Sequence, residues 1–272
     1  MSLKETAKQV LSVIENGGYT RPNGEWVNIQ DLVTYAVDHT KTYTPEMCGS
    51  LTIESSNSGE SVQFEVTSET TQVATKRLID EGFENVAVLN FASARNPGGG
   101  FLRGAKAQEE DLTRCSALYP CLVPQTLYYE GNRNQKSMLY TDHIIYSPKV
   151  PWFKVRSRDE PDELYVASVI TAPAPNAAQA LAREVDQEAI EATLRRRCGY
   201  VLRIGKAHGA KALVLEAWGC GVFGNDPEMV ARVFADWLNS PEFVGAFDKV
   251  VFAIMHNEKT RRNFEAFTAI FA

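Results

Sequence analysis

An apolar run that leads into three consecutive glycines constrains the fold of this chain more than any other feature. Residues 85–91 (NVAVLNF) predict a buried strand, and the glycines at residues 98–100 follow in the loop after it. Seven residues later, a Gln-Glu-Glu sequence at residues 108–110 leads into a predicted helix over residues 109–118. Glycines without side chains permit tight turns, positive φ angles and close approach of backbone N–H groups to an anion. The pattern therefore predicts a strand, a site loop and a helix that carries two adjacent carboxylates.

A second glycine-rich loop, residues 219–227 (GCGVFGNDP), follows another apolar run at residues 212–217. Asp226 and Pro227 predict the start of a helix, as N-cap and first helical residue. Free N–H groups and the helix dipole at such a position favour a bound diphosphate, although a simple strand-to-helix turn has the same pattern.

The remaining elements also alternate along the chain. Helices are predicted over residues 3–14, 31–38, 71–80 and 187–208, with a hairpin around residues 22–24. Strands are predicted over residues 62–66, 138–146, 164–171, 212–217 and 249–255, and residues 119–137 read as a long surface connection. Helices between strands predict crossover connections and a largely parallel sheet with ligands beyond the strands' carboxyl ends. We expect one α/β domain over residues 1–272, with residues 1–60 as an N-terminal extension packed on it.

Composition restricts the class of protein. No apolar stretch approaches 18 residues and no leader is evident, so we expect a soluble cytoplasmic protein that does not bind membranes. The net charge of -6 disfavours nucleic acid, and the only basic run, residues 195–197, reads as the solvated face of a helix. Five cysteines without CxxC spacing and four scattered histidines predict reduced thiols, no metal site and no cofactor. Cys220 in the second loop reads as a small loop residue, with a reactive thiol as the alternative.

Two carboxylates beside an anion-holding loop suit the hydrolysis of a glycosidic bond, which needs a proton for the leaving oxygen and a positioned water. Side chains of consecutive helical residues diverge by about 100°. Glu109 and Glu110 are therefore expected to divide the work rather than to oppose each other across a sugar.

Residues 90–110 (NFASARNPGGGFLRGAKAQEE) closely resemble the signature loop of bacterial-type poly(ADP-ribose) glycohydrolases, a family of the macrodomain superfamily. Residues 219–227 resemble the second, diphosphate-binding loop of macrodomains, and residues 171–176 (TAPAPN) continue the likeness. The resemblance covers most of the chain from the first helix onward. It implies a three-layer α/β/α macrodomain-like fold with a mixed, largely parallel sheet.

The resemblance also implies roles for individual residues. Glu110 would protonate the leaving oxygen and then activate water, Glu109 would hold ribose hydroxyls, and Gln108 would orient both. Asn96 would contact the distal ribose, with a turn-forming Asn-Pro as the alternative, and Phe223 would lie beneath that ribose unless it anchors the core. The expected substrate-binding residues are Asn96, Gly98, Gly99, Gly100, Gln108, Gly219, Gly221, Val222, Phe223, Gly224 and Asn225.

The implied activity is hydrolysis of the ribose–ribose bonds of poly(ADP-ribose), mainly from chain ends, with release of ADP-ribose and with ADP-ribosylated proteins as partners. Residues 264–268 are a candidate cap that restricts the cavity to chain ends. A mono-ADP-ribosyl hydrolase would share the same motifs. A non-catalytic ADP-ribose-binding macrodomain would share both loops, but would have no reason to keep the two acids.

Overall fold

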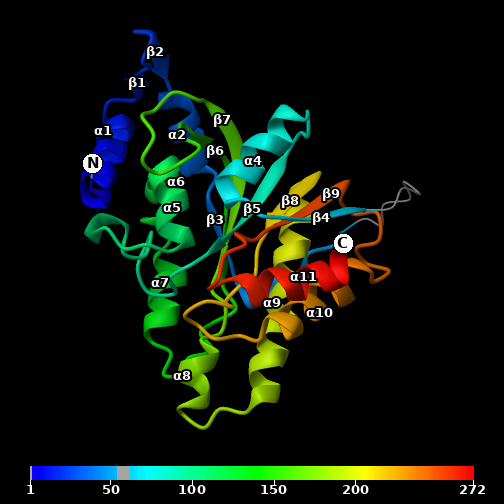
Figure 1. Cartoon of the computed structure of the whole chain (residues 1–272). Helices are drawn as coiled ribbons and strands as arrows, with labels where there is room; N and C mark the ends of the chain where they lie inside the picture. Colours follow the sequence, from blue (N-terminus) through cyan, green and yellow to red (C-terminus); the bar gives the residue numbers. More distant parts are fainter. Residues whose placement is uncertain (1, 54–61) are drawn as a thin grey trace.

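A seven-stranded sheet forms the centre of the molecule in the computed structural model, which describes residues 2–53 and 62–272. Figure 1 shows the chain coloured along its length, and the order of strands across the sheet is β3-β6-β7-β5-β8-β9-β4. The strands are β3 (Lys41–Tyr43), β4 (Gln63–Thr67), β5 (Val86–Phe91), β6 (Ile144–Trp152), β7 (Tyr165–Ala172), β8 (Ala212–Leu215) and β9 (Lys249–Ala253).

The sheet is mixed and largely parallel, as the sequence predicts. β5 pairs in parallel with both β7 and β8, and β9 pairs in parallel with β8 and β4. β6 runs antiparallel to β7 and to β3, so the two antiparallel pairs lie at one end of the sheet. The carboxyl ends of β5, β8 and β9 therefore meet at one edge, where a ligand site is expected.

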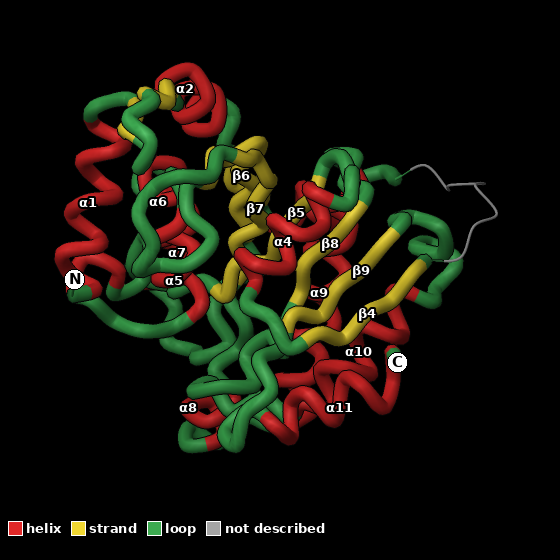
Figure 2. The backbone as a smooth tube through the Cα atoms, turned by 45° about the horizontal axis from the view of Figure 1, so that its top comes forward, coloured by secondary structure: helices red, strands yellow, loops and turns green. Residues whose placement is uncertain are grey.

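Helices cover both faces of the sheet (Figure 2). Alternate residues of β5 divide between the two cores: Leu89 packs with α9 (Gln187–Ala207), α10 (Pro227–Leu238) and α11 (Arg261–Phe271). Val88 packs on the other face with α4 (Thr71–Asp80), α5 (Gln108–Cys115), α6 (Leu118–Leu122) and α7 (Thr126–Arg133). A strand buried on both faces reads as a continuous apolar run, which is the pattern of residues 85–91.

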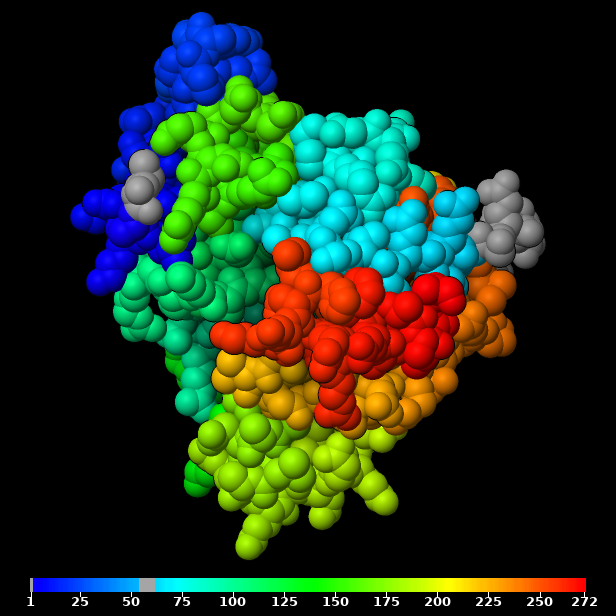
Figure 3. Space-filling model, viewed as in Figure 1, coloured from blue at the N-terminus to red at the C-terminus, as the bar shows by residue number. Residues whose placement is uncertain are grey.

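The N-terminal segment packs along one side of the molecule, at the dark blue end of the colour bar in Figure 3. It contains α1 (Leu3–Glu15), the hairpin of β1 (Gly18–Thr20) and β2 (Trp26–Asn28), α2 (Gln30–Asp38), β3 and α3 (Pro45–Ser50). A capping box between Ser2 and Glu5 starts α1. Since β3 adds an edge strand to β6, this segment extends the central sheet, while its β1 and β2 form a separate two-stranded sheet.

Three predictions about local structure are wrong. Residues 119–137 are not a surface connection, because α6 and α7 occupy most of them and bury Tyr128 and Tyr129. The strand predicted at residues 138–146 begins later, at Ile144, and continues through Pro148 and Pro151 to Trp152. The helix predicted over residues 109–118 ends at Cys115.

The basic run at residues 195–197 is also not wholly a solvated face. The Arg197 side chain is fully buried in α9, donates from Nε to Asp142 over 2.7 Å and reaches the carbonyl of Pro173 from Nη1 over 2.7 Å. Arg196 shares the same carboxylate, at 2.6 Å. These bonds join α9 to the loops before β6 and after β7, so Arg197 is structural.

No helix among residues 2–53 and 62–272 is long and apolar enough to span a membrane.

Candidate active site

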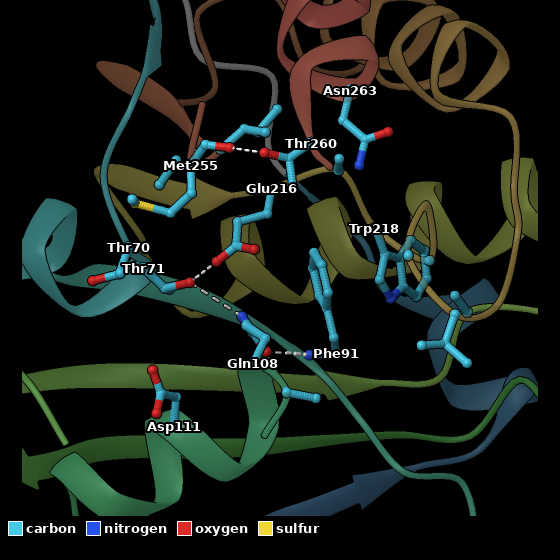
Figure 4. A pocket seen from close by; sticks show the side chains of 18 of the residues that line it. Thr70, Thr71, Phe91, Gln108, Asp111, Glu216, Trp218, Met255, Thr260 and Asn263 are labelled. Atoms are coloured by element: carbon cyan, nitrogen blue, oxygen red, sulfur yellow. Dashed lines mark hydrogen bonds between the residues drawn. The ribbon is translucent and has the colours of Figure 1, made fainter. Parts of the chain in front are cut away.

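A cavity of about 590 Å³ opens beyond the carboxyl ends of β5, β8 and β9. Its walls come from the N-terminus of α4, the start of α5, the second glycine-rich loop and the segment that leads into α11. Phe91, Trp218 and Phe223 give it a strongly apolar lining (Figure 4). The second loop and the two ends of the first, at residues 91–92 and 106–108, therefore contribute to one crevice at the expected edge of the sheet, whereas Gly98, Gly99 and Gly100 do not line it.

The two glutamates lie at the start of α5, directly after the cavity-lining Gln108, but neither is among the residues that line the cavity. One Glu110 oxygen, Oε1, accepts a hydrogen bond from the backbone N–H of Gly100 over 2.7 Å. The other, Oε2, is buried and has no partner among the described residues. Glu109 Oε2 accepts from the N–H of Ser93 over 2.7 Å, and its Oε1 lies 3.4 Å from Asn90 Nδ2. Both glutamates are almost entirely buried, at 2% and 7% exposure.

The backbone of the first glycine loop contacts these carboxylates, so the acidic groups next to it belong to the protein and not to a ligand. Gly99 has φ of +59°, and a Cβ atom there would lie 2.4 Å from Glu110 Oε1 and 3.0 Å from Glu109 Oε2. Only glycine leaves room for both oxygens at this backbone conformation. The two carboxylates thus converge on one point while each accepts from a different backbone N–H, and the division of work between them stays a prediction.

Gln108 fastens the start of α5 to the end of β5. Its Oε1 accepts from the N–H of Phe91 over 2.8 Å, and its Nε2 donates to the carbonyl of Leu89 over 2.8 Å. Gln108 also lines the cavity. Its amide is therefore committed to the strand that carries the first loop, which fits the orienting role expected of it.

Burial raises the pKa of Glu109 to about 8, and the charge of Glu110 acts in the same direction. The hydrogen bonds from Ser93, Asn90 and Gly98 oppose this shift without cancelling it. The site therefore holds a proton on this side chain at neutral pH.

The second loop offers unused backbone donors to the cavity. The N–H groups of Gly221, Val222 and Phe223 donate to no group in the described part of the chain. A Cβ atom at Gly221 would meet nothing within 4 Å, and Val222 is 96% exposed. At the helix terminus itself, the Asp226 carboxylate already accepts from Glu228 and Met229. The backbone donors left free for an anion are therefore those of the loop rather than those of the first turn of α10.

Buried contacts fix the shape of this loop. Gly219 has φ of +75°, and a Cβ atom there would lie 2.4 Å from Asn225 Nδ2. Asn225 is buried and donates to the carbonyls of Pro175 and Gly219 at 2.8 and 3.1 Å. Gly224, with φ of +69°, leads into this residue. Asn225 thus holds the loop to residues 171–176 and does not line the cavity.

Phe223 lines the cavity and lies with its ring centroid 6.2 Å from that of Tyr140. It is also partly buried against the core. Phe223 therefore has features of both alternatives, a ring that faces the ligand and an anchor in the core. Asn96 is exposed and forms a turn, with its N–H bonded to Ser93 Oγ at 3.1 Å and its carbonyl accepting from Gly99. It is not among the residues that line the cavity.

The C-terminal segment approaches the cavity at a different point from the one predicted. In residues 264–268, Phe264 stacks on His256 and Phe267 is fully buried in the core. Thr260 and Asn263, one turn earlier, line the cavity instead.

Cys220 lies in the second loop, and burial raises the pKa of its thiol, which fits a small loop residue better than a reactive one. All five cysteines are unpaired. Within residues 2–53 and 62–272, no group of three or more His, Cys, Asp or Glu side chains is placed to hold a metal ion.

Among the cavity residues that sequence reasoning missed are two polar side chains in contact with each other, Thr71 and Glu216. The Thr71 hydroxyl donates to Glu216 Oε1, and both side chains face the cavity beside Gln108 (Figure 4). The position of Glu216, directly after a buried parallel strand, is the signal that would have found it.

Comparison with known proteins decides the family. The microbial-type PARG catalytic domain, where PARG stands for poly(ADP-ribose) glycohydrolase, matches residues 7–155. The chain belongs to this family. A search of curated proteins found no match.

Solved PARG structures extend the likeness to the whole chain. The enzyme from Thermomonospora curvata is 42% identical over 99% of each chain, with a TM-score of 0.92, and its complex with the inhibitor ADP-HPD is 42% identical over 98% of each chain, with a TM-score of 0.88. The Deinococcus radiodurans enzyme in complex with ADP-ribose is 43% identical over 89% of this chain and 97% of its own, with a TM-score of 0.78. The predicted α/β, macrodomain-like fold and the predicted family are confirmed.

Proposed function

We propose that this PARG family member, an enzyme that hydrolyses poly(ADP-ribose), uses Glu110 as its general acid and base. The observation that carries the assignment is the asymmetry of the Glu110 carboxyl. Oε1 is held by the Gly100 N–H, whereas Oε2 is buried without a partner among the described residues. A proton on Oε2 therefore has no competing acceptor among the described residues, and we infer that it is given to a substrate oxygen when the ligand reaches this end of α5.

The chemistry follows from this oxygen. Glu110 Oε2–H gives its proton to the ribose oxygen that leaves, as the bond between that oxygen and the anomeric carbon breaks. The Glu110 carboxylate then takes a proton from the water that adds to the anomeric carbon, which restores the acid. The N–H of Gly100 stabilises the carboxylate between the two steps.

Glu109 has a different role in this proposal. Both of its oxygens already interact with donors of the β5 end and its loop, so it is less free to move than Glu110. We assign it the ribose hydroxyls next to the bond that breaks. Its raised pKa, about 8, lets it donate a hydrogen bond to a hydroxyl oxygen at neutral pH.

ADP-ribose fits the rest of the cavity. The free N–H groups of Gly221, Val222 and Phe223 suit a diphosphate, and the Phe223 ring suits the face of the distal ribose. A PARG from Deinococcus radiodurans is solved with ADP-ribose bound, which supports the same ligand here. ADP-ribosylated proteins would be the carriers of the substrate. The five unpaired cysteines support a reducing compartment such as the cytoplasm.

Cleavage mainly from chain ends is the mode that this cavity favours. It is about 590 Å³ in volume, and Thr260 and Asn263, at the start of α11, form part of its wall. We expect ADP-ribose to be the dominant early product from poly(ADP-ribose), with little release of the last unit from a modified protein. A time course by chromatography tests this, and early accumulation of long free oligomers would count against it.

The assignment of the acid is tested by Glu110→Gln. The amide keeps the shape and the contact with Gly100 but has no acidic proton, so the turnover of poly(ADP-ribose) should fall by about 10² or more. Calorimetry with ADP-ribose should still detect binding. The matched control is Glu130→Gln, an exposed glutamate of α7 that is not among the residues lining the cavity, and its rate should stay within a few-fold of the parent. If the two variants lose activity equally, Glu110 is not the acid.

A further inference from the structure

Glu216 is a cavity carboxyl that the proposed mechanism does not use. It follows β8 directly and precedes the second loop, and its side chain reaches across the cavity floor toward Thr71 and Gln108 (Figure 4). The Thr71 hydroxyl donates to its Oε1. None of the hydrogen bonds between described residues ends on its Oε2.

Backbone groups fix the direction of the hydrogen bonds that lead to Glu216. The N–H of Phe91 can only donate and the carbonyl of Leu89 can only accept, and each lies 2.8 Å from one end of the Gln108 amide. Gln108 therefore has its oxygen toward Phe91 and its nitrogen toward Leu89. The same nitrogen lies 3.3 Å from Thr71 Oγ1, so the threonine oxygen accepts there and its single proton is left for Glu216 Oε1.

This series of hydrogen bonds determines which oxygen of a neutral Glu216 side chain carries the proton. Because Oε1 of Glu216 accepts from Thr71, the proton of the neutral acid lies on Oε2. In the neutral form the cavity therefore presents an O–H donor at this point, and in the ionised form it presents a negative charge.

The surroundings of Glu216 favour the neutral form. On α5, Asp111 lies close enough for its charge to disfavour ionisation, and on the approach to α4, Glu69 is already paired with Arg77 at 3.0 Å. Glu109 follows Gln108 on α5, and Lys106 is a cation that also lines the cavity. Burial raises the pKa of Glu216 to about 8, and the Gln108 amide opposes the shift only in part. A diphosphate in the cavity adds further negative charge.

We propose that Glu216 is a specificity-determining residue that binds the ADP-ribose unit as a neutral acid, donating a hydrogen bond from Oε2 to an acceptor atom of the ligand, so that its ionisation weakens binding. The acceptor is a phosphate, ribose or ring-nitrogen atom. The inference rests on the proposed function, because it takes ADP-ribose as the ligand of this cavity.

The sign of the pH dependence follows from the protonation state that binds. Glu216 is neutral below pH 8 and ionises above it, so affinity is retained at pH 7 and lost as the pH rises through 8. If only the neutral form binds, this one side chain raises the Kd about tenfold between pH 7 and pH 9. Glu109, with a pKa of about 8, titrates over the same range, so the contribution of Glu216 must be isolated by substitution.

The experiment is calorimetric titration of the full chain with ADP-ribose at pH 7 and pH 9, in the parent and in Glu216→Gln. Glutamine keeps an oxygen for Thr71 and an N–H for the ligand at both pH values, so its ratio of Kd at pH 9 to Kd at pH 7 should be about tenfold smaller than that of the parent. The matched control is Glu69→Gln, another carboxyl of the cavity wall, which is ion-paired and should keep the parent ratio.

Glu216→Met is a second test variant, because the methionine side chain neither donates a hydrogen bond nor ionises. It should bind more weakly than the parent at pH 7 and show the same reduced ratio as Glu216→Gln. A parent ratio that persists in both variants would overturn the role of Glu216. A parent that does not bind ADP-ribose at pH 7 would instead contradict the proposed function, so the two failures are distinguishable.

Discussion

Replacing Gly99 by alanine tests the finding that the first glycine loop exists to accommodate the two glutamates. The new Cβ atom would lie 2.4 Å from Glu110 Oε1, against an ordinary contact of 3.4 Å or more. The carboxylate must therefore move by about 1 Å, and a misplacement of that size costs on the order of 10² in rate. The positive φ of +59° adds about 1 kcal/mol of backbone strain to any residue other than glycine.

A control variant separates the effect of backbone strain from the effect of carboxylate displacement, because it introduces only the backbone strain. Gly209 has φ of +72° after α9, and a Cβ atom there would meet nothing within 4 Å. Gly209→Ala should lose about 1 kcal/mol of stability and keep its activity. Gly99→Ala should lose a similar or somewhat larger stability and about 10² in the initial rate of ADP-ribose release from poly(ADP-ribose). Equal rates in the two variants, with both folded by thermal melting, would refute the proposed contact between loop and carboxylates.

Two further predictions concern the second loop and Glu109. Gly221→Leu has space for its side chain but would cover the free N–H groups beside it, so the Kd for ADP-ribose should rise by about tenfold or more in calorimetry while the melting temperature changes little. An unchanged Kd would place the diphosphate elsewhere. Glu109 has a folded pKa of about 8 against an ordinary glutamate pKa of 4.5, so the folded state keeps a proton that the unfolded state loses, and stability should fall as the pH rises from 4.5 to 8. Glu109→Gln should reduce that slope by about 1 kcal/mol per pH unit, and thermal melts at pH 5 and pH 7.5 that change equally in parent and variant would contradict the shift.

Most of the α/β alternation is predictable because strands buried on both faces are continuous apolar runs and helices begin at recognisable caps. The predicted helix over residues 71–80 matches α4, and Asp226 and Pro227 start α10 as expected. The parallel core of the sheet follows from these elements alone.

The failures have a shared physical cause, which is that local signals were outweighed by tertiary packing. Pro120, Pro124 and Gly131 indicate a loop, but α6 and α7 form there and bury two tyrosines in the core on the α4 and α5 side of the sheet. Pro148 and Pro151 argue against a strand, but β3 pairs with β6 only at residues 144–146, so no strand on that side requires a backbone N–H from these prolines. The carbonyl of Pro151 instead accepts from the N–H of Ala117. Arg197 looks like a surface cation because its partners, Asp142 and Pro173, are distant in sequence.

For the site, the sequence predicted the chemistry but not the geometry. The types of residue at the glycine loops and at Glu109 and Glu110 were enough to predict a glycosidic site, since few other reactions need that combination. Their mutual geometry was not predictable, because an argument from helix periodicity treats side chains as fixed directions. In the structure, Glu109 turns to the N–H of Ser93 and Glu110 to that of Gly100, and both end beside Gly99. The donors that direct the carboxylates come from the loop, and the space between them exists only because the loop has no side chain there. The glycines and the glutamates are therefore one unit, and neither half of the motif would form this site without the other.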